Sequence, residues 1–412
     1  MGSRLPETAV TRCAACVTAL LVACLAMPIA AATPSYPLVG TQQDQCYAVS
    51  GATMPCPASG QPLAGQDAAS GGRATAYVDH GDGTVTDTVT GLMWAKVPID
   101  AVAFADTGAT AKASRLAGHD DWRVPSLREL YSLIDFRGGF TGDPATSRPY
   151  IDAKAFTFAY AAGTGLGDAA HGRRPIDVQE WTSTRYIGRT MGRDETVFGV
   201  NFADGRIKGY PVMDPANRMQ TPHRLALRLV RGPTYGTNDF HAGGEVVEDR
   251  ATGLTWQRGD SRTPVPWAEA LATCDRLVLG GHDDWRLPTA KELQSVIDTT
   301  RVPALDPVFD LSDPAAYLWT STTHLESPPP AAETAPFHAR GELAVYFAVG
   351  PALGKVESPP GSGRRVWMDV HGAGAQRSDP KTATPGQWPG GFGPQGDDIR
   401  GANLAKCVRR TR

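Results

Sequence analysis

Two short stretches of this chain carry a histidine, two carboxylates and an arginine in the same order, a set that could bind a metal or transfer protons. They read His119-Asp120-Asp121-Trp122-Arg123 and His282-Asp283-Asp284-Trp285-Arg286. A turn leading into a capped helix would use the same residue types, with tryptophan in the core and arginine beside a carboxylate. Because both stretches retain every residue, a folding role suits them better than a single active site.

Each stretch is followed by the sequence signal for a helix N-terminus. Ser126-x-x-Glu129 in the first case and Thr289-x-x-Glu292 in the second are capping boxes. The capping role explains both glutamates, so we assign neither of them to catalysis.

A carboxylate ends each of these two helices. Asp135 and Asp298 stand where a negative charge opposes the helix dipole, so each needs a specific partner. We expect Arg123 and Arg286 to be those partners. The predicted structural set is therefore Trp122, Arg123, Glu129, Asp135, Trp285, Arg286, Glu292 and Asp298.

These signals belong to a duplicated folding unit of roughly 160 residues, too long for a solenoid repeat. Matching segments occur at 85–94 and 247–256, and the string WTST recurs at 181–184 and 319–322. We place the first copy at 77–233 and the second at 239–412. Residues 33–76, rich in Gly, Ala, Gln and Pro, are expected to be a linker with a small disulfide loop.

The secondary structure predicted for each copy is two helices followed by short antiparallel strands, which is an α+β pattern. A hairpin turns at Thr90-Gly91. In the second copy Trp267, Leu271, Cys274 and Val278 recur at the helical period on one face. Apolar strands follow at 197–202 and 343–347, and closing strands at 225–230 and 404–408.

The duplication also pairs the cysteines. Four of the seven lie outside the N-terminal segment: Cys46, Cys56, Cys274 and Cys407. When the copies are aligned, the last two fall opposite residues that are not cysteine in the first copy. Two cysteines that form a disulfide are expected to occur together in one copy and to be missing together from the other. We therefore predict Cys274–Cys407, and Cys46–Cys56 by elimination.

The N-terminus is typical of a targeting segment, with Arg4 and Arg12 before an apolar run, and no later run is long enough to span a bilayer. Two outcomes compete. Cleavage after Ala32 would remove residues 1–32 as a signal peptide, whereas a lipobox would make Cys24 a lipid anchor. We favour plain secretion, because the residues after Cys24 stay apolar. The expected location is the periplasm, the outer cell surface or the exterior.

The motif string resembles a known family over roughly residues 40–412. G-L-x-W, D-W-R-[LV]-P-[ST]-x-x-E-L, W-T-S-T and a last strand ending C-V-R are similar to the family named for the C-terminal domain of the Legionella collagen-like adhesin. The resemblance implies an exported bacterial protein with two tandem C-type-lectin-like domains. That fold characteristically has a disulfide from its first helix to its last strand. The name-giving member binds sulfated polysaccharides.

The copies differ most at 350–401, a long Gly- and Pro-rich segment of the second copy. Long loops in compact domains are usually functional or disordered. Tryptophan can stack on a sugar ring and arginine can bind carboxylate or sulfate groups, whereas the alternative is a solvated loop. The predicted ligand-binding residues are Arg364, Arg365, Trp367, His371, Arg377, Lys381 and Trp388.

We expect a non-catalytic protein that binds a glycan or a surface protein, with a structural or assembly component of the cell envelope as the alternative. A net charge of −3 argues against a nucleic-acid partner. We expect no enzyme, metal or cofactor. No common catalytic motif, EF-hand spacing or lectin calcium triplet occurs in the sequence. The related formylglycine-generating enzymes need a reactive cysteine pair, and here the four mature cysteines are assigned to disulfides.

Overall fold

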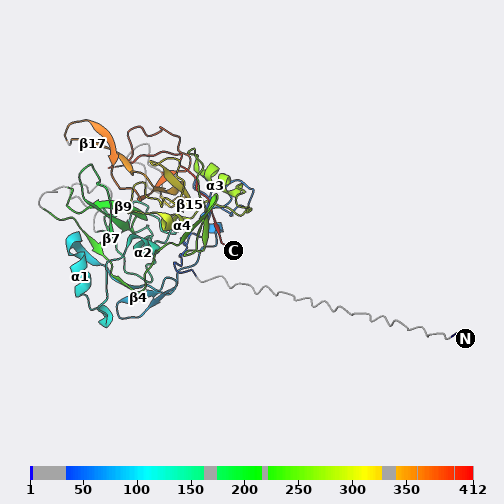
Figure 1. The fold of residues 1–412 in the computed structure, drawn as a ribbon. Helices are drawn as coiled ribbons and strands as arrows, with labels where there is room; N and C mark the ends of the chain where they lie inside the picture. The colour runs from blue at the N-terminus through cyan, green and yellow to red at the C-terminus, as the bar shows by residue number, and fades with distance from the viewer. Residues whose placement is uncertain are drawn as a thin grey trace. The chain divides into compact units, whose positions relative to one another are not determined.

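The computed structural model describes residues 1–2, 34–161, 174–215, 221–326, 340–359, 361–393 and 395–411. Residues 34–411 form one compact unit, in which strands predominate over helices (Figure 1). The predicted α+β class is therefore correct at this level. The expected signal cleavage site and Cys24 lie outside the described residues.

The elements of the first copy follow the predicted order. They are β3 (Tyr77–Asp79), β4 (Thr84–Asp87), β5 (Met93–Ala95), β6 (Ile99–Ala103), α1 (Thr107–Ala113), α2 (Leu127–Ser132), β7 (Gln179–Arg185), β8 (Thr196–Asn201), β9 (Arg206–Pro211), β10 (Arg224–Leu227) and β11 (Val230–Arg231). Short 3-10 helices occur at Phe104–Asp106 and Leu116–Gly118.

The second copy repeats this order in part: among its described residues it has the additional strands β17 and β18, but no strand before its first helix that corresponds to β6 and one closing strand in place of two. It contains β12 (Phe240–Gly243), β13 (Val246–Asp249), β14 (Leu254–Gln257), α3 (Trp267–Asp275), α4 (Ala290–Val296), β15 (Tyr317–His324), β16 (Leu343–Ala348), β17 (Leu353–Glu357), β18 (Arg365–Asp369), β19 (Gln376–Pro380) and β20 (Val408–Arg410). The N-terminal segment adds β1 (Cys46–Tyr47), β2 (Thr53–Met54) and a 3-10 helix at Asp67–Ala69.

One eight-stranded sheet runs through both copies, in the order β15-β16-β19-β9-β8-β7-β10-β6. All of its neighbours are antiparallel except β7 and β10. The copies meet where Gln376 of β19 pairs with Ile207 of β9. Each copy also has a four-stranded sheet, β11-β5-β4-β3 or β12-β13-β14-β20. The copies, expected as tandem domains, therefore share a sheet.

The second helices of the two copies pack against each other over this sheet (Figure 1). The predicted stripe of α2, Leu130 with Leu133 and Ile134 after it, is buried. Across the seam, the Lys291 ammonium of α4 donates to the Ser132 carbonyl at 2.7 Å. Residues of both copies belong to one continuous hydrophobic core, so burial of apolar surface holds the copies together.

Residues 34–76 differ from the expected linker. Tyr36 is 2% exposed and belongs to the shared core. The Gln43 amide donates to the Thr323 carbonyl at 2.8 Å and accepts the Thr323 N–H at 2.9 Å. The Thr41 carbonyl accepts the Phe136 N–H at 2.8 Å. The segment thus bonds to both copies, and its few apolar residues gave no periodic pattern from which this packing could be predicted.

Both predicted disulfides are confirmed. Cys46 and Cys56 are bonded across a separation of 10 residues. Cys274 of α3 is bonded to Cys407, which directly precedes β20, across a separation of 133 residues. The comparison of the copies was therefore sufficient to assign the pairing.

Three predicted boundaries are wrong. The second closing strand, expected at 404–408, is β20 at Val408–Arg410. Helix α3 ends at Asp275, and Val278, expected on its buried face, is 72% exposed. The first closing strand is also interrupted between Leu227 and Val230, where the buried Arg228 donates hydrogen bonds and forms an ion pair with Glu180. Val278 keeps the helical spacing of α3 in the sequence although the helix has already ended, which is why the pattern predicted a longer helix.

The capping boxes are present in both copies, but the expected ion pairs are wrong. Arg123 binds Glu129 through two hydrogen bonds of 2.7 and 2.6 Å, and Arg286 binds Glu292 in the same way. Glu129 also accepts the Ser126 N–H at 2.8 Å. The carboxylate of a capping box points back toward the residues before the helix, which brings it to the arginine.

The carboxylates at the other helix ends have different partners. Asp135 binds Arg137 at 2.6 Å. Asp298 accepts the N–H and hydroxyl of Thr300 at 3.0 and 2.6 Å. A local turn therefore satisfies each of them without the distant arginine. Among the described helices, none has the length and apolar character needed to cross a membrane.

Candidate ligand-binding site

The repeated His-Asp-Asp-Trp-Arg stretches make the same internal contacts in both copies. The Trp122 indole N–H donates to the Leu116 carbonyl at 3.1 Å, and Trp285 has the equivalent bond. The second aspartate binds an arginine of the closing strand: Asp121 to Arg231 at 2.6 Å, with the same pair in copy two. No group of three potential metal-ligating side chains occurs in the part of the chain that is described.

The segment at 350–401 contains three strands among its described residues. It contains the β17–β18 hairpin and then β19, which enters the large sheet between β16 and β9. In Figure 1 the hairpin, in orange, projects from the body of the unit. Strand β19 therefore forms the second copy's side of the seam, as β9 forms the first copy's, and the seven predicted ligand residues lie in different parts of the segment.

Two of the seven converge, but on a buried carboxylate. His371 is 1% exposed, and its Nε2 lies 2.7 Å from Asp397 Oδ1, while Arg377 binds the other oxygen of Asp397. Burial and the neighbouring Arg377 lower the pKa of His371 to about 4, against the opposing effect of Asp397. The imidazole is therefore neutral near pH 7, and the three side chains bond to one another within the second copy.

Lys381 is buried in a separate place. Its ammonium donates to the Thr323 hydroxyl at 2.9 Å and lies 4.2 Å from the centre of the Trp267 ring. Burial lowers the pKa of Lys381 to about 7. It is 3% exposed, so it packs the second copy rather than meeting a ligand.

The remaining four predicted residues lie at or near the β17–β18 hairpin. Arg364, Arg365 and Trp367 are exposed, and the Lys355 ammonium lies 5.6 Å from the centre of the Trp367 ring. Trp388 is half-buried, and the carbonyl of its neighbour Pro389 accepts a hydrogen bond from Lys355 at 2.8 Å. The seven residues therefore do not form one site, and only the hairpin group is free to meet a ligand.

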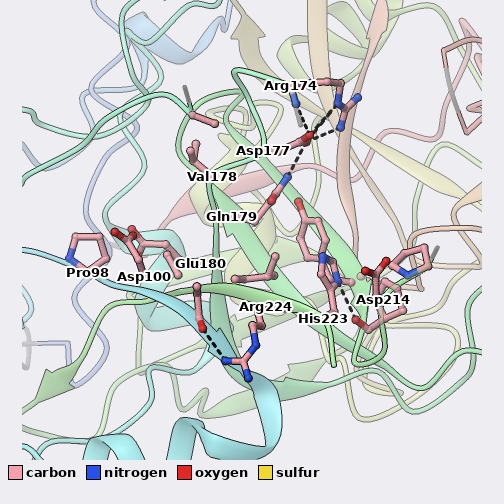
Figure 2. Close-up of a pocket in the computed structure, with 18 of the residues that line it drawn as sticks. Pro98, Asp100, Arg174, Asp177, Val178, Gln179, Glu180, Asp214, His223 and Arg224 are labelled. Atoms are coloured by element: carbon pink, nitrogen blue, oxygen red, sulfur yellow. Dashed lines mark hydrogen bonds and ion pairs between the residues drawn. The ribbon is translucent and has the colours of Figure 1, made fainter. Parts of the chain in front are cut away.

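A cavity of about 860 Å³ lies elsewhere, on the first-copy half of the large sheet (Figure 2). Its walls come from the strands β6, β7, β9 and β10 and from the loops at 157–161, 174–178 and 190–194. Val370 and Gln395 of the second copy complete it. None of the seven predicted ligand residues lines this pocket.

Ion pairs and hydrogen bonds fix several polar side chains of the pocket. Arg174 binds Asp177 at 2.8 Å, and the Gln179 amide donates to Asp177 at 3.4 Å (Figure 2). Burial raises the pKa of Asp177, but the hydrogen bonds and charge of Arg174 outweigh it and the pKa is lowered. Arg224 is fixed by a 2.9 Å bond to the Ala101 carbonyl.

Aromatic and imidazole rings complete the lining. His223 Nδ1 lies 3.0 Å from the Pro211 carbonyl, and burial lowers the pKa of His223. The rings of Phe158 and Tyr160 meet edge to face with centres 5.0 Å apart. The cavity thus combines fixed hydrogen-bonding groups with apolar ring surface.

One feature of the sequence indicates this pocket: a loop that is much longer in the first copy than in the second. The segment between the second helix and the WTST strand spans 136–180 in the first copy but only 299–318 in the second. The extra residues supply the walls at 157–161 and 174–178. The prediction instead used the longer insertion at 350–401, and it therefore placed the ligand-binding site in the second copy.

The chain belongs to the Lcl C-terminal domain family, whose model matches residues 83–231 and 245–367. The two matches coincide with the two copies, so the predicted family and duplication are confirmed. Searches of curated proteins and of solved structures find no match to this chain.

Proposed function

We propose that this protein is an exported, non-catalytic binding protein of the adhesin type, and that it binds glycans in the pocket of the first copy. The observation that carries the proposal is this cavity of about 860 Å³, within the range of small-ligand sites in proteins. Membership of the Lcl C-terminal domain family supports an adhesin-like role. The two disulfides suit an oxidising compartment outside the cytoplasm.

The chemistry of the lining suits a sugar. A sugar presents hydroxyl groups at its edges, and Gln179, Arg224 and Asp100 offer donors and acceptors for them. The faces of a sugar ring are apolar, and Phe158 and Tyr160 offer ring surface. Carboxylates such as Asp177 are held by arginine, an arrangement that favours binding over proton transfer.

We further propose that each copy has the C-type-lectin-like fold that the family resemblance implies. The bond from the first helix of copy two to the residue before its last strand supports this, as do the long loops between short strands. A shared fold does not identify the ligand that a protein binds, so the proposal of glycan binding rests on the pocket.

The test is a glycan array probed with residues 33–412, with and without calcium, followed by calorimetry on the glycans that bind. The double variant Asp100→Ala/Arg224→Ala removes two exposed lining groups, and we expect affinity to fall at least about tenfold, since each lost hydrogen bond contributes about 1 kcal/mol. Asp283→Ala, an exposed aspartate outside the pocket, is the control and should bind normally.

Two results would count against the proposal. If the folded wild-type protein binds no glycan, the assembly role in the cell envelope becomes the better explanation. If glycans bind but the double variant binds as tightly as Asp283→Ala does, the pocket is not the site.

A further inference from the structure

The pocket and the exposed hairpin are close neighbours along the chain. Val370, which lines the pocket, directly follows β18, and Trp367 precedes it by three residues. At the rise of a strand, three residues cover at most about 10 Å. Trp367 is 40% exposed, one of the few large apolar side chains in the described residues that meets solvent to this extent.

Strand alternation places Trp367 on the same face of the hairpin as Asp369, whereas the pocket-lining Val370 follows on the other face. Side chains two residues apart in a strand share a face, so Arg365, Trp367 and Asp369 point the same way. The Asp369 carboxylate accepts the Tyr186 hydroxyl at 2.6 Å, and its carbonyl accepts the Met191 N–H at 2.8 Å. Met191 lines the pocket, so the end of β18 adjoins the pocket rim.

The hairpin is held in place before any ligand arrives. Lys355 lies directly across from Trp367 in the register of β17 and β18. Its N–H donates to the Gly396 carbonyl at 2.7 Å, and its ammonium donates to the Pro389 carbonyl at 2.8 Å. Gln395, which precedes Gly396, also lines the pocket. The same support therefore anchors the hairpin and one wall of the cavity, which lowers the cost of ordering both on binding.

We propose that the pocket and the hairpin are two subsites of one surface that binds a segment of a linear polysaccharide. One sugar unit occupies the pocket, and the following units lie along Trp367 toward Arg365. The aromatic ring offers a face for a sugar ring, and the cations offer partners for hydroxyl or acidic substituents. This inference rests on the glycan-binding function proposed above and adds that the ligand is an internal stretch of polymer.

The experiment compares affinity with chain length. Size-graded oligosaccharides from chitin, which carry no acidic groups, and from heparin, which are sulfated, are titrated into the wild-type protein, from disaccharide to octasaccharide. We expect affinity in at least one series to rise about tenfold or more with length, as the second subsite is filled.

Trp367→Ala should abolish most of that gain, weakening the octasaccharide by a larger factor than the disaccharide. Val278→Ala, an exposed apolar residue outside the pocket and the hairpin, is the matched control and should behave as wild type. Arg365→Gln distinguishes the two polymers, because it should weaken binding of the heparin series only.

Affinity that does not depend on length would overturn the inference. So would a Trp367→Ala variant that weakens disaccharide and octasaccharide equally, or neither. In those cases glycan binding in the pocket still stands. If the folded wild-type protein binds neither series, the proposed function fails for these polymers and the inference fails with it.

Discussion

At the scale of single residues, the clearest feature is the arginine that binds the glutamate of each capping box. Glu292 is buried with Arg286 and also accepts the Thr289 N–H at 2.8 Å. Burial opposes ionisation of Glu292, but the charge and hydrogen bonds of Arg286 outweigh it, so its pKa is lowered. In the first copy the side chain of Arg123 is 37% exposed, compared with 15% for Arg286. The same arginine–glutamate pair therefore occurs in both copies, and its arginine is more deeply buried in the second copy.

We predict that Glu292→Ala costs more stability than Glu129→Ala. The first change leaves a buried guanidinium without its partner and should cost about 3 kcal/mol. The second leaves an arginine that can turn to water, and should cost roughly 1–2 kcal/mol through the lost cap. Urea unfolding at neutral pH measures both. Equal costs would show that the depth of the arginine does not matter.

The Glu292 effect should depend on pH in one direction. Because the folded pKa is lowered from the ordinary 4.5, its contribution to stability is complete above that value. The contribution disappears as pH falls through the folded pKa. The difference between wild type and Glu292→Ala should therefore shrink as the pH falls below 4.5. A difference that grows on acidification would contradict the assignment.

At the scale of elements, the comparison of the copies determined the disulfides, but not the strand partners. Cys274–Cys407 joins α3 to the start of β20, and Cys46–Cys56 closes a small loop beside β1. Strand β19 was predicted only as part of a loop, because Gln376, Arg377, Ser378 and Asp379 have no apolar alternation. It is a strand because β16 and β9 offer it partners on both sides.

We predict that loss of the long-range disulfide destabilises the protein more than loss of the short one. The chain-entropy model gives about 5 kcal/mol for a loop of 133 residues and about 3 kcal/mol for a loop of 10. The variants are Cys274→Ser/Cys407→Ser and Cys46→Ser/Cys56→Ser, compared by urea unfolding. A larger loss for the second pair would mean that packing around Cys46 dominates over chain entropy.

At the scale of the whole molecule, the shared sheet, the α2–α4 contact and the N-terminal segment join the copies. We predict that residues 34–411 unfold in one cooperative transition, with equal calorimetric and van't Hoff enthalpies. Leu130→Ala and Leu293→Ala are matched core truncations, one in each copy, and both side chains are fully buried. Each should lower the same transition, at a cost of about 2–5 kcal/mol. Two transitions that respond separately would show independent domains.

The sequence by itself determined the features that depend on neighbouring residues or on comparison of the copies. The capping boxes, the buried stripe of α2 and the duplication follow from local spacing, and the disulfides follow from what each copy kept or lost. In each case the interaction partners are close in the chain or marked by the repeat.

Only the tertiary structure decided the partners that meet across long stretches of chain. It placed His371 and Arg377 on a buried carboxylate, packed Tyr36 into the core, and built a pocket from first-copy loops with Val370 of the second. Polar side chains carry no periodic signal that says whether they will face water or another strand. That outcome depends on which strand edges are available to pair, a property of the folded sheet.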